Sequence, residues 1–477
     1  MPVRGLHGLH GLHRLYVLVS YVVAGLLVIA MAGCGGGDQR TVVTVWSWEP
    51  SMASVAKEFE KSNPDIRVVV KSTSGYENLN TAIQNGYGLP DVVQLEYYAL
   101  PQYAVSGQLL DITNRVSDMA DFYTPGTWSS VTLNHEVYGL PMDSGPMAFF
   151  YNKSVFDQAG VDASSIHTWE DYYQAAKKLK SIGVYIAADS GDASFFNAMV
   201  WLAGGEPFHT SDDGKTVTVN LSTDPGTLTF TAFWQKMIDE GLVDTSVKTW
   251  SDGWKRAVGD GTVASVFAGA WMPSLLLADV PGTAGLWRVG TMPTADGSSV
   301  NSENGGSSLA VLKSTRKPNA AYRFVEYACH NRRGIDIRVA GGAFPADNET
   351  LDSPDFLTRT TITDSRGIDI PYFGGQEFNR VLSTAADDVS VRYQYLPFEV
   401  YARGDFRSTV GTAYQWSKAK LAFDAVQRRI DEGQKNSDGS ALSLPQNPGS
   451  KVSLMDGVAL WQKDLIEYGT NQGFTMR

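Results

Sequence analysis

Strand and helix patterns alternate near the N-terminus, and this alternation most constrains the fold. Three runs rich in β-branched residues, 41–46, 66–70 and 92–95, are typical of buried strands. The segments between them, 50–62 and 79–83, place apolar residues at helical spacing. A β-α-β-α-β order predicts a parallel sheet with helices on its faces, so we expect an α/β fold.

Polar and aromatic residues follow two of these predicted strands. Trp48 and Glu49 come after the first strand, and Glu96 and Tyr97 after the third. Ligands of parallel α/β sheets bind at the carboxyl ends of the strands, so these side chains are candidates for a binding site. Trp46 lies inside the first strand, and we expect it in the core.

Residues 1–33 have the organisation of a secretory signal peptide. Arg4 and Arg14 give a positive start without an acidic residue, and an apolar run covers residues 15–32. An uncleaved membrane anchor is the alternative, because a helix that spans a bilayer needs about 20 apolar residues. No other stretch of the sequence is long and apolar enough to span a bilayer.

The end of this leader resembles the lipobox of bacterial lipoproteins. Small residues precede Cys34, although Met31 stands where leucine is usual. The resemblance implies cleavage before Cys34 and lipidation of that cysteine, with palmitate among the attached chains. Residues 34–40 are glycine-rich and would then form a flexible tether that holds the folded body clear of the membrane.

Cysteine content indicates how the mature chain must be stabilised. The sequence has only two cysteines, Cys34 and Cys329. If Cys34 carries lipid, no disulfide can form within the mature chain, so stability must come from a large core. A chain of 477 residues is long enough for two or three domains.

Charge excludes some classes of partner. The formal net charge is −12, and the leader contributes basic residues only, so the mature part is more acidic still. An acidic surface argues against a nucleic-acid partner and against docking on anionic lipid by charge. Aromatic residues make up 11% of the chain, with 12 Trp and 21 Tyr, which is a high content for a globular protein. Such rings could bind a ligand through their faces.

Helical patterns dominate the rest of the chain. A capping pattern at Thr168 to Asp171 opens a helix that we expect to stop at Gly183. Three further helices and one polar loop are expected at these positions: helices 319–328, 407–432 and 455–468, and the loop 433–451.

Several short motifs occur in a defined order between residues 45 and 346. They are Val45-Trp46-Ser47-Trp48, Asn63-Pro64-Asp65-Ile66, Gly88-Leu89-Pro90-Asp91, Gly107-Gln108-Leu109, Tyr138-Gly139-Leu140-Pro141, Gly269-Ala270-Trp271, Gly305-Gly306-Ser307 and Gly342-Ala343-Phe344-Pro345. Together they resemble the extracellular sugar-binding proteins of bacterial ABC importers, the cluster that includes maltose-binding protein. The family pattern usually has methionine near Val266, and the segment after residue 350 matches only loosely.

The resemblance implies a two-lobed periplasmic-binding-protein fold, in which each lobe is discontinuous and about three hinge crossings join the lobes. The expected N-terminal lobe comprises residues 41–144 and 307–345, and the expected C-terminal lobe comprises 145–306 and 346–477. The crossings are expected near residues 143–147, 302–308 and 344–348, where glycines and prolines could absorb backbone rotation.

A sugar site needs aromatic rings for C–H faces and planar carboxylates or amides for hydroxyl groups. This chemistry selects Trp48, Glu49, Glu96 and Asp143 at strand ends and at the first crossing, with Trp201 and Trp271 as platforms of the second lobe. Trp271 also matches the family's Gly-x-Trp position. Further candidates are Glu303, Tyr372 and Phe373. Asp91 follows a proline at a strand start and is equally suited to capping local backbone.

The function implied is capture of a sugar by lobe closure and delivery to the permease of an ABC transporter. The resemblance further implies a monomer on the outer face of the cytoplasmic membrane, held by the lipid at Cys34, with no reaction, cofactor or metal. The histidines outside the leader (His135, His167, His209 and His330) lack metal-ligand spacing.

Three alternatives stay open at this point. A secreted glycoside hydrolase could use Glu49 and Glu96 as acid and base. A binding protein could instead take glycerol-phosphate, an amino acid or peptide, or ferric iron. A structural or adhesive surface lipoprotein would bind no small ligand at all.

Overall fold

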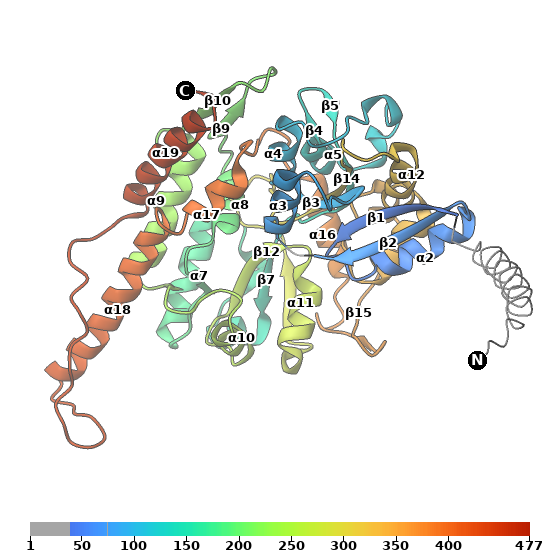
Figure 1. Ribbon diagram of the computed structural model, residues 1–477. Helices are drawn as coiled ribbons and strands as arrows, with labels where there is room; N and C mark the ends of the chain where they lie inside the picture. The colour runs from blue at the N-terminus through green and yellow to red at the C-terminus, as the bar shows by residue number, and fades with distance from the viewer. Residues whose placement is uncertain (1–38, 74) are drawn as a thin grey trace, which may run out of the picture.

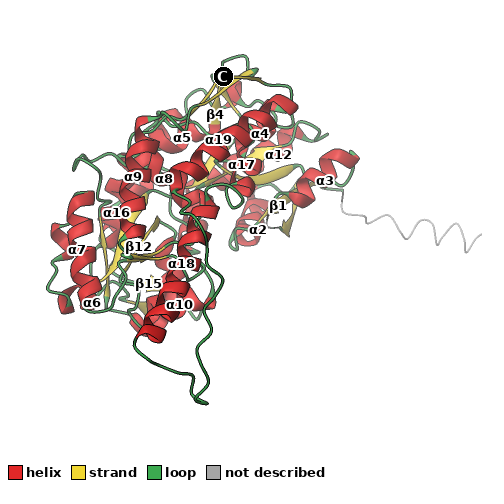
Figure 2. Ribbon diagram, turned by 90° about the vertical axis from the view of Figure 1, so that its left-hand side faces the viewer, coloured by secondary structure: helices red, strands yellow, loops and turns green. Residues whose placement is uncertain are grey.

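The computed structural model describes residues 39–73 and 75–477. The signal peptide, Cys34 and most of the expected tether lie outside the described residues. The described chain forms two lobes, each built around a β-sheet with helices packed against it (Figures 1 and 2).

The N-terminal lobe is built on a five-stranded sheet with the order β2-β1-β3-β14-β6. Its strands are β1 (Thr41–Ser47), β2 (Ile66–Ser72), β3 (Val92–Glu96), β6 (Leu140–Asp143) and β14 (Ser307–Val311). The first three are parallel, as predicted, but β14 runs antiparallel to both β3 and β6. The sheet is therefore mixed. The antiparallel strand β14 comes from a segment more than 200 residues after β3 in the chain.

Amphipathic helices cover this sheet. The helix α2 (Met52–Ser62) buries Met52, Val55, Ala56 and Phe59, which is the face that its sequence spacing predicts. The ring of Phe59 meets that of Phe324 edge-on at 5.4 Å, which joins α2 to α12 (Pro318–Cys329). Cys329 is buried on the apolar face of α12, and burial raises the pKa of its thiol to about 12.

The C-terminal lobe is built on an antiparallel sheet with the order β12-β7-β13. Its strands are β7 (Met147–Asn152), β12 (Ser265–Gly269) and β13 (Trp287–Gly290). The helix α7 (Trp169–Ser181) packs beside it and begins with a capping box, because the side chains of Thr168 and Asp171 each accept the other's backbone N–H.

The remaining elements complete both lobes. In chain order they are α3 (Glu77–Asn85), α4 (Leu100–Val105), α5 (Pro125–Val131), β4 (Thr132–Leu133), β5 (Glu136–Val137), α6 (Lys153–Gln158), β8 (Ala187–Ala188), α8 (Ala193–Leu202), β9 (Phe208–Thr210), β10 (Thr216–Val219), α9 (Pro225–Asp239), β11 (Val243–Asp244), α10 (Asp252–Gly259), α11 (Met272–Asp279), α13 (Arg332–Ala340), α14 (Asn348–Leu351), α15 (Pro354–Leu357), β15 (Ile362–Thr363), β16 (Asp369–Ile370), α16 (Phe378–Asp387), α17 (Glu399–Asp405), α18 (Gly411–Asp431), α19 (Leu454–Asn471) and β17 (Thr475–Met476).

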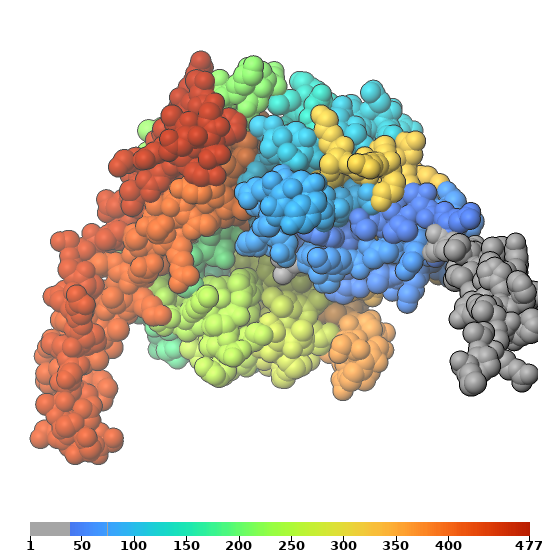
Figure 3. All heavy atoms as spheres, viewed as in Figure 1, coloured from blue at the N-terminus to red at the C-terminus, as the bar shows by residue number. Residues whose placement is uncertain are grey.

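The predicted C-terminal helices are present with shifted ends. A helix was expected from residue 407, but α18 begins at Gly411, because the chain makes a tight turn in which the Gly411 N–H donates to the Phe406 carbonyl. The helix α18 and the exposed loop after it extend away from the body of the molecule (Figure 3). Within residues 39–73 and 75–477, no helix is both long and apolar enough to cross a membrane.

Three crossing segments join the lobes, as predicted, and they are hydrogen-bonded to one another. The Ser144 N–H donates to the Phe344 carbonyl at 3.2 Å, and the Met147 N–H donates to the Ser302 carbonyl at 3.0 Å. The Asn304 N–H donates to the Gly145 carbonyl at 2.8 Å. The crossings therefore form one connected strip of backbone rather than three independent links.

Gly306 lies where this strip meets the N-terminal lobe, and it generates a stability prediction. Its φ is +82°, and a Cβ there would come within 2.5 Å of the Tyr97 ring. We expect Gly306→Ala to lower the free energy of unfolding by about 1–3 kcal/mol, since both the backbone and the packing are strained. Chemical denaturation of the variant and wild type measures this difference.

Gly404→Ala is the matched control for that substitution. Gly404 lies in α17, and a Cβ there would meet no atom within 4 Å. We expect this variant to be as stable as the wild type or slightly more stable. Equal stability of the two alanine variants would contradict the proposed strain at the hinge.

Candidate functional site

A cavity of about 210 Å³ lies between the lobes, beside the second crossing. The N-terminal lobe contributes Glu96 from the end of β3, and the crossing contributes Asn304 and Gly305. The C-terminal lobe supplies most of the wall, including the ends of β8 and β12 and the start of α8. We call this space the first cavity.

Three tryptophans form one wall of the first cavity. Trp250 lies between the other two, with ring centroids 4.7 Å from Trp254 and 5.5 Å from Trp271. Trp254 is fully buried, whereas Trp250 and Trp271 remain partly accessible. The ring planes are tilted by 58° and 63° from that of Trp250, so the wall presents both ring edges and ring faces. An accessible indole face suits a weakly polar ligand surface such as the C–H face of a sugar ring.

The hinge holds Trp271 in place. Its indole N–H donates to the Asn304 carbonyl at 2.7 Å, which satisfies the only polar atom of the side chain. Gly305 has a φ of +107°, and a Cβ at that position would come within 2.8 Å of the Trp271 indole nitrogen. The close approach of Trp271 to the crossing therefore requires glycine at position 305.

Trp250 is held in an unusual backbone conformation. Its φ is +67°, in the left-handed region that residues other than glycine, Asn and Asp rarely occupy. The residue precedes Ser251, whose hydroxyl accepts the Trp254 N–H at 3.3 Å and caps α10. Non-glycine residues in this conformation cluster at ligand sites, and Trp250 lines the first cavity.

Buried acid and indole groups also line the first cavity. Asp189 accepts the Trp234 indole N–H at 2.8 Å and the Gly191 N–H at 2.9 Å. Burial raises the pKa of Asp189 to about 6, although these two hydrogen bonds act in the opposite direction and lower the pKa. Asp192 caps α8 by accepting the Ser194 and Phe195 N–H groups.

Arg403 closes one end of the first cavity. Its guanidinium lies 3.6 Å from the centroid of the Tyr98 ring, which belongs to the N-terminal lobe, and donates to the Ser194 hydroxyl at 2.7 Å. It is also 3.3 Å from the carboxylate of the fully buried Glu399. Arg403 therefore connects the two lobes at the edge of the cavity.

Two carboxyl groups belong to the hinge: Glu303 is buried and Asp143 is partly buried. Asp143 accepts the Ser307 hydroxyl at 2.9 Å, and Glu303 accepts the Ser144 hydroxyl at 2.7 Å. The other carboxylate oxygen of Glu303 is buried with no hydrogen-bond partner among the described residues. Burial raises the pKa of Asp143 to about 7 and that of Glu303 to about 8, and the nearby Glu49 carboxylate adds to the shift at Asp143.

The six predicted site residues fall into four places. Glu96 and Trp271 line the first cavity. Trp48 and Glu49 are partly buried at the end of β1, where the Gln94 side chain accepts both of their backbone N–H groups. Asp143 is part of the hinge network.

The sixth residue, Trp201, lies at the far end of α8 and lines a different cavity. Of the further candidates, Glu303 belongs to the hinge, and Tyr372 and Phe373 are fully buried in the core of the C-terminal lobe. The structure thus brings Glu96 and Trp271 together and leaves the other four predicted residues outside the first cavity.

Residues that the sequence analysis did not select complete the first cavity. Trp250 and Trp254 flank a helix N-cap at Ser251, so two tryptophans around a capping serine were a usable signal. Asp189 and Arg403 gave no comparable signal. Arg403 comes from the region after residue 350, where the family motifs end, and only the fold brings it to the cleft.

Asp91 has the structural role that the sequence left open for it. Its carboxylate accepts the Thr44 N–H and hydroxyl and the Thr315 hydroxyl, and it pairs with Lys317 at 2.8 Å. Trp46 is only partly buried, with Lys71 over its ring at 4.7 Å, so the expectation of a core position is met in part.

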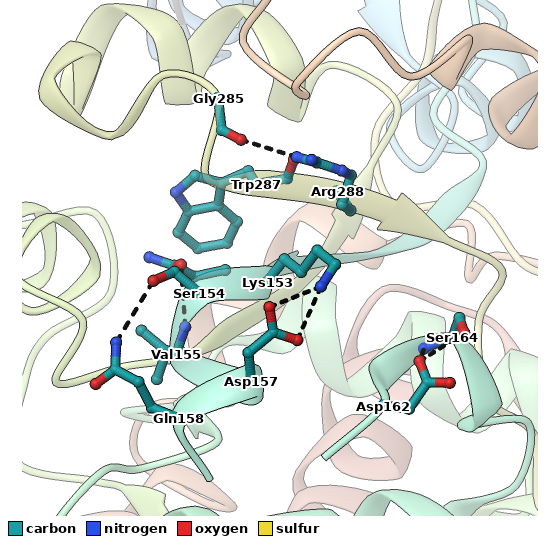
Figure 4. Close-up of polar contacts among 11 residues, drawn as sticks. Lys153, Ser154, Val155, Asp157, Gln158, Asp162, Ser164, Gly285, Trp287 and Arg288 are labelled. Carbon is teal, nitrogen blue, oxygen red and sulfur yellow. Dashed lines mark hydrogen bonds and ion pairs between the residues drawn. The ribbon is translucent and has the colours of Figure 1, made fainter. Parts of the chain in front are cut away.

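A shallow hollow at the outer end of the C-terminal sheet presents Lys153 and Arg288 (Figure 4). Lys153 pairs with Asp157 within α6, and Arg288 donates to the backbone carbonyls of Gly285 and Trp287. Both cations are therefore engaged by neighbouring groups. In the described part of the chain, no group of three or more His, Cys, Asp or Glu is placed to hold a metal ion.

Comparison with known proteins identifies the family. The family model described as bacterial extracellular solute-binding protein matches residues 46–329, and the chain belongs to this family. The lactose-binding protein of Rhizobium radiobacter is 27% identical over 326 residues, which cover 65% of this chain and 75% of that protein.

Solved structures give the same result. The ABC transporter-associated binding protein from B. animalis subsp. lactis Bl-04, in complex with β-1,6-galactobiose, is 48% identical with a TM-score of 0.76, covering 92% of this chain and all of that one. The galacto-N-biose-/lacto-N-biose I-binding protein from Bifidobacterium longum shares the fold at 23% identity and a TM-score of 0.69, covering 92% of this chain and 99% of that one.

The hinge carboxyls generate a pH prediction. Their pKa values in the folded chain, about 7 for Asp143 and about 8 for Glu303, lie above the ordinary 3.8 and 4.5. The folded state therefore binds these protons more tightly than the unfolded state. Their contribution to stability is full below about pH 4 and is lost as the pH rises through about 7 and 8.

Glu303→Gln removes one of these titrations, because the amide stays neutral at all pH values. We expect the variant to lose less stability than the wild type between pH 5 and 8.5, with a difference of about 1 kcal/mol or more at pH 8.5. Urea denaturation across this range measures it, with exposed Glu467→Gln as the control. Parallel stability curves for Glu303→Gln and wild type would contradict the assignment.

Proposed function

We propose that this protein captures a short saccharide in the first cavity by closure of its two lobes and delivers it to the permease of an ABC transporter. The proposed lobes comprise residues 41–144 with 307–345, and 145–306 with 346–477. On this proposal the protein performs no reaction, because its role is to bind and release an unchanged ligand.

The observation that carries the proposal is an interlobe cavity with an indole wall facing acid groups. The Trp250 and Trp271 rings suit the C–H face of a sugar, and the Glu96 and Asp189 carboxylates suit its hydroxyl groups. Because the walls come from both lobes and the hinge, a ligand in the cavity contacts the closed form more fully than the open form. Such a ligand shifts the equilibrium toward closure by the difference in its affinity for the two forms.

The ligand we favour is a disaccharide that contains galactose. The relative at 48% identity was solved with β-1,6-galactobiose, and it aligns with 92% of this chain. The first cavity is small, at about 210 Å³, and Arg403 closes one end of it, which favours a short ligand over a long chain.

The proposed contact residues extend the predicted set. Glu96 and Trp271 would contact the sugar together with Trp250, Asp189 and Arg403. Trp48 and Glu49 would complete the N-terminal side, because β1 and β3 are neighbours and their carboxyl ends lie side by side. Asp143 would act through the hinge.

We further propose that the protein acts as a monomer on the outer face of the cytoplasmic membrane. The leader of residues 1–33 and the lipobox-like junction at Cys34 support export and lipid anchoring, with residues 34–40 as the tether.

A thermal-shift titration of the purified chain tests the ligand class. We expect β-1,6-galactobiose at about a hundred times its dissociation constant to stabilise the fold by about 2.7 kcal/mol, with the sugar recovered intact. Glycerol-phosphate and amino acids serve as comparison ligands. Stabilisation by a non-sugar alone would overturn the saccharide class, and hydrolysis of the disaccharide would indicate an enzyme.

Substitution of Trp271 tests the location of the site. We expect Trp271→Ala to weaken saccharide binding at least about tenfold, because the largest aromatic contact on the hinge side of the cavity is lost. Trp416→Ala is the matched control, since Trp416 lies on α18 and its indole N–H donates to the Gly449 carbonyl, away from the cavity. Isothermal titration calorimetry measures both, and equal affinities would remove Trp271 from the site.

A further inference from the structure

A second and larger cavity, of about 690 Å³, also lies between the lobes. The N-terminal lobe contributes the start of α4, the helix α5 and the tip of the β4–β5 hairpin. The C-terminal lobe contributes Trp201 at the end of α8, Thr210 at the end of β9, and residues 390–395. The function proposed above makes no use of this space.

Side chains separate the second cavity from the first. Arg403 stacks on Tyr98 and lies 5.8 Å from the centroid of the Tyr395 ring, and Tyr395 in turn meets Trp201 edge-on at 6.0 Å. The two cavities also contact opposite ends of α8, with Ser194 in the first and Trp201 in the second. Seven residues of helix place these positions about 10 Å apart along its axis.

The wall from the C-terminal lobe is aromatic, and only 4% of Trp201 and 7% of Tyr393 is exposed. Trp201 and Tyr393 are stacked, with ring centroids 4.8 Å apart and planes 8° from parallel. The Trp201 indole N–H donates to the Ser390 carbonyl at 3.0 Å, so the ring is fixed and its polar atom is satisfied. Tyr395 meets both of these rings edge-on.

The facing wall, from the N-terminal lobe, combines another aromatic ring with polar groups. Trp128 is stacked on Tyr123 at 5.7 Å with 15° between the planes. The hairpin tip consists of Asn134 and His135, which have φ values of +53° and +65°. A two-residue hairpin tip normally favours glycine at its second position. A backbone with positive φ therefore costs free energy at His135, whose imidazole lines the cavity.

From this geometry we infer that the second cavity is a separate saccharide-binding site. Aromatic faces from both lobes would hold C–H surfaces of the sugar, and Asn134, His135 and Gln394 would bind hydroxyl groups. Because its walls belong to both lobes, a sugar in this site biases the same closure that the first cavity uses. The two sites are therefore coupled through the lobe equilibrium.

Calorimetric titration of the full chain with β-1,6-galactobiose tests this inference. Wild type should bind two equivalents with unequal affinities. His135→Gly should weaken the second binding event at least about fivefold while leaving the first within about twofold, since glycine fits the φ of +65° and only the imidazole is lost. Trp201→Ala should abolish the second event and Trp271→Ala the first.

The outcomes separate this inference from the proposed function. One equivalent in wild type, with His135→Gly and Trp201→Ala unchanged, overturns the second site and leaves the proposed function intact. No binding by wild type overturns both. Loss of the only binding event in Trp201→Ala, with Trp271→Ala unaffected, overturns the two-site inference and moves the functional site to the second cavity.

Discussion

The three crossing segments determine the geometry of both cavities. They are tied together by backbone hydrogen bonds, such as that from Asn304 to Gly145, and the carboxyl groups of the buried Glu303 and the partly buried Asp143 lie among them. A buried carboxylate that lacks full pairing is costly, so Glu303, with one oxygen unpartnered in the described structure, favours its protonated form. Ionisation of Asp143 and Glu303 is therefore unfavourable in the hinge, and its free-energy cost depends on the positions of the serines that donate hydrogen bonds to them.

Trp271 connects this hinge to the first cavity. Its indole N–H is bonded to the carbonyl of Asn304, a crossing residue, while its ring forms part of the tryptophan wall. The position of the ring therefore depends on the backbone of the second crossing. On the proposed function, the shape of the first cavity would change together with the lobe angle, and binding would be linked to closure.

Local features of the fold could be predicted from the sequence, because they depend on neighbouring residues. The first three strands, the buried face of α2 and the capping box at Thr168 follow from spacing and residue type alone. The antiparallel strand β14 could not be derived in this way, since its partners are distant in the chain. The same limit applies to the site: Asp143 ends β6, and its carboxylate accepts the hydroxyl of Ser307 in β14, a partner that is distant in the chain.

Trp201 shows why residue type alone does not assign a residue to a cavity. As a tryptophan of the second lobe it was a reasonable platform, and the structure does place it in a cavity wall between the lobes. The length of α8 determines which cavity Trp201 lines. Ser194, in the first turn of the helix, contacts Arg403 at the first cavity, whereas Trp201 lies in the last turn, at the second cavity. A rigid helix that spans both cavities also carries any displacement at one end to the other. Since Arg403 contacts both Ser194 and Tyr98, the side chain that separates the two cavities is in contact with both lobes.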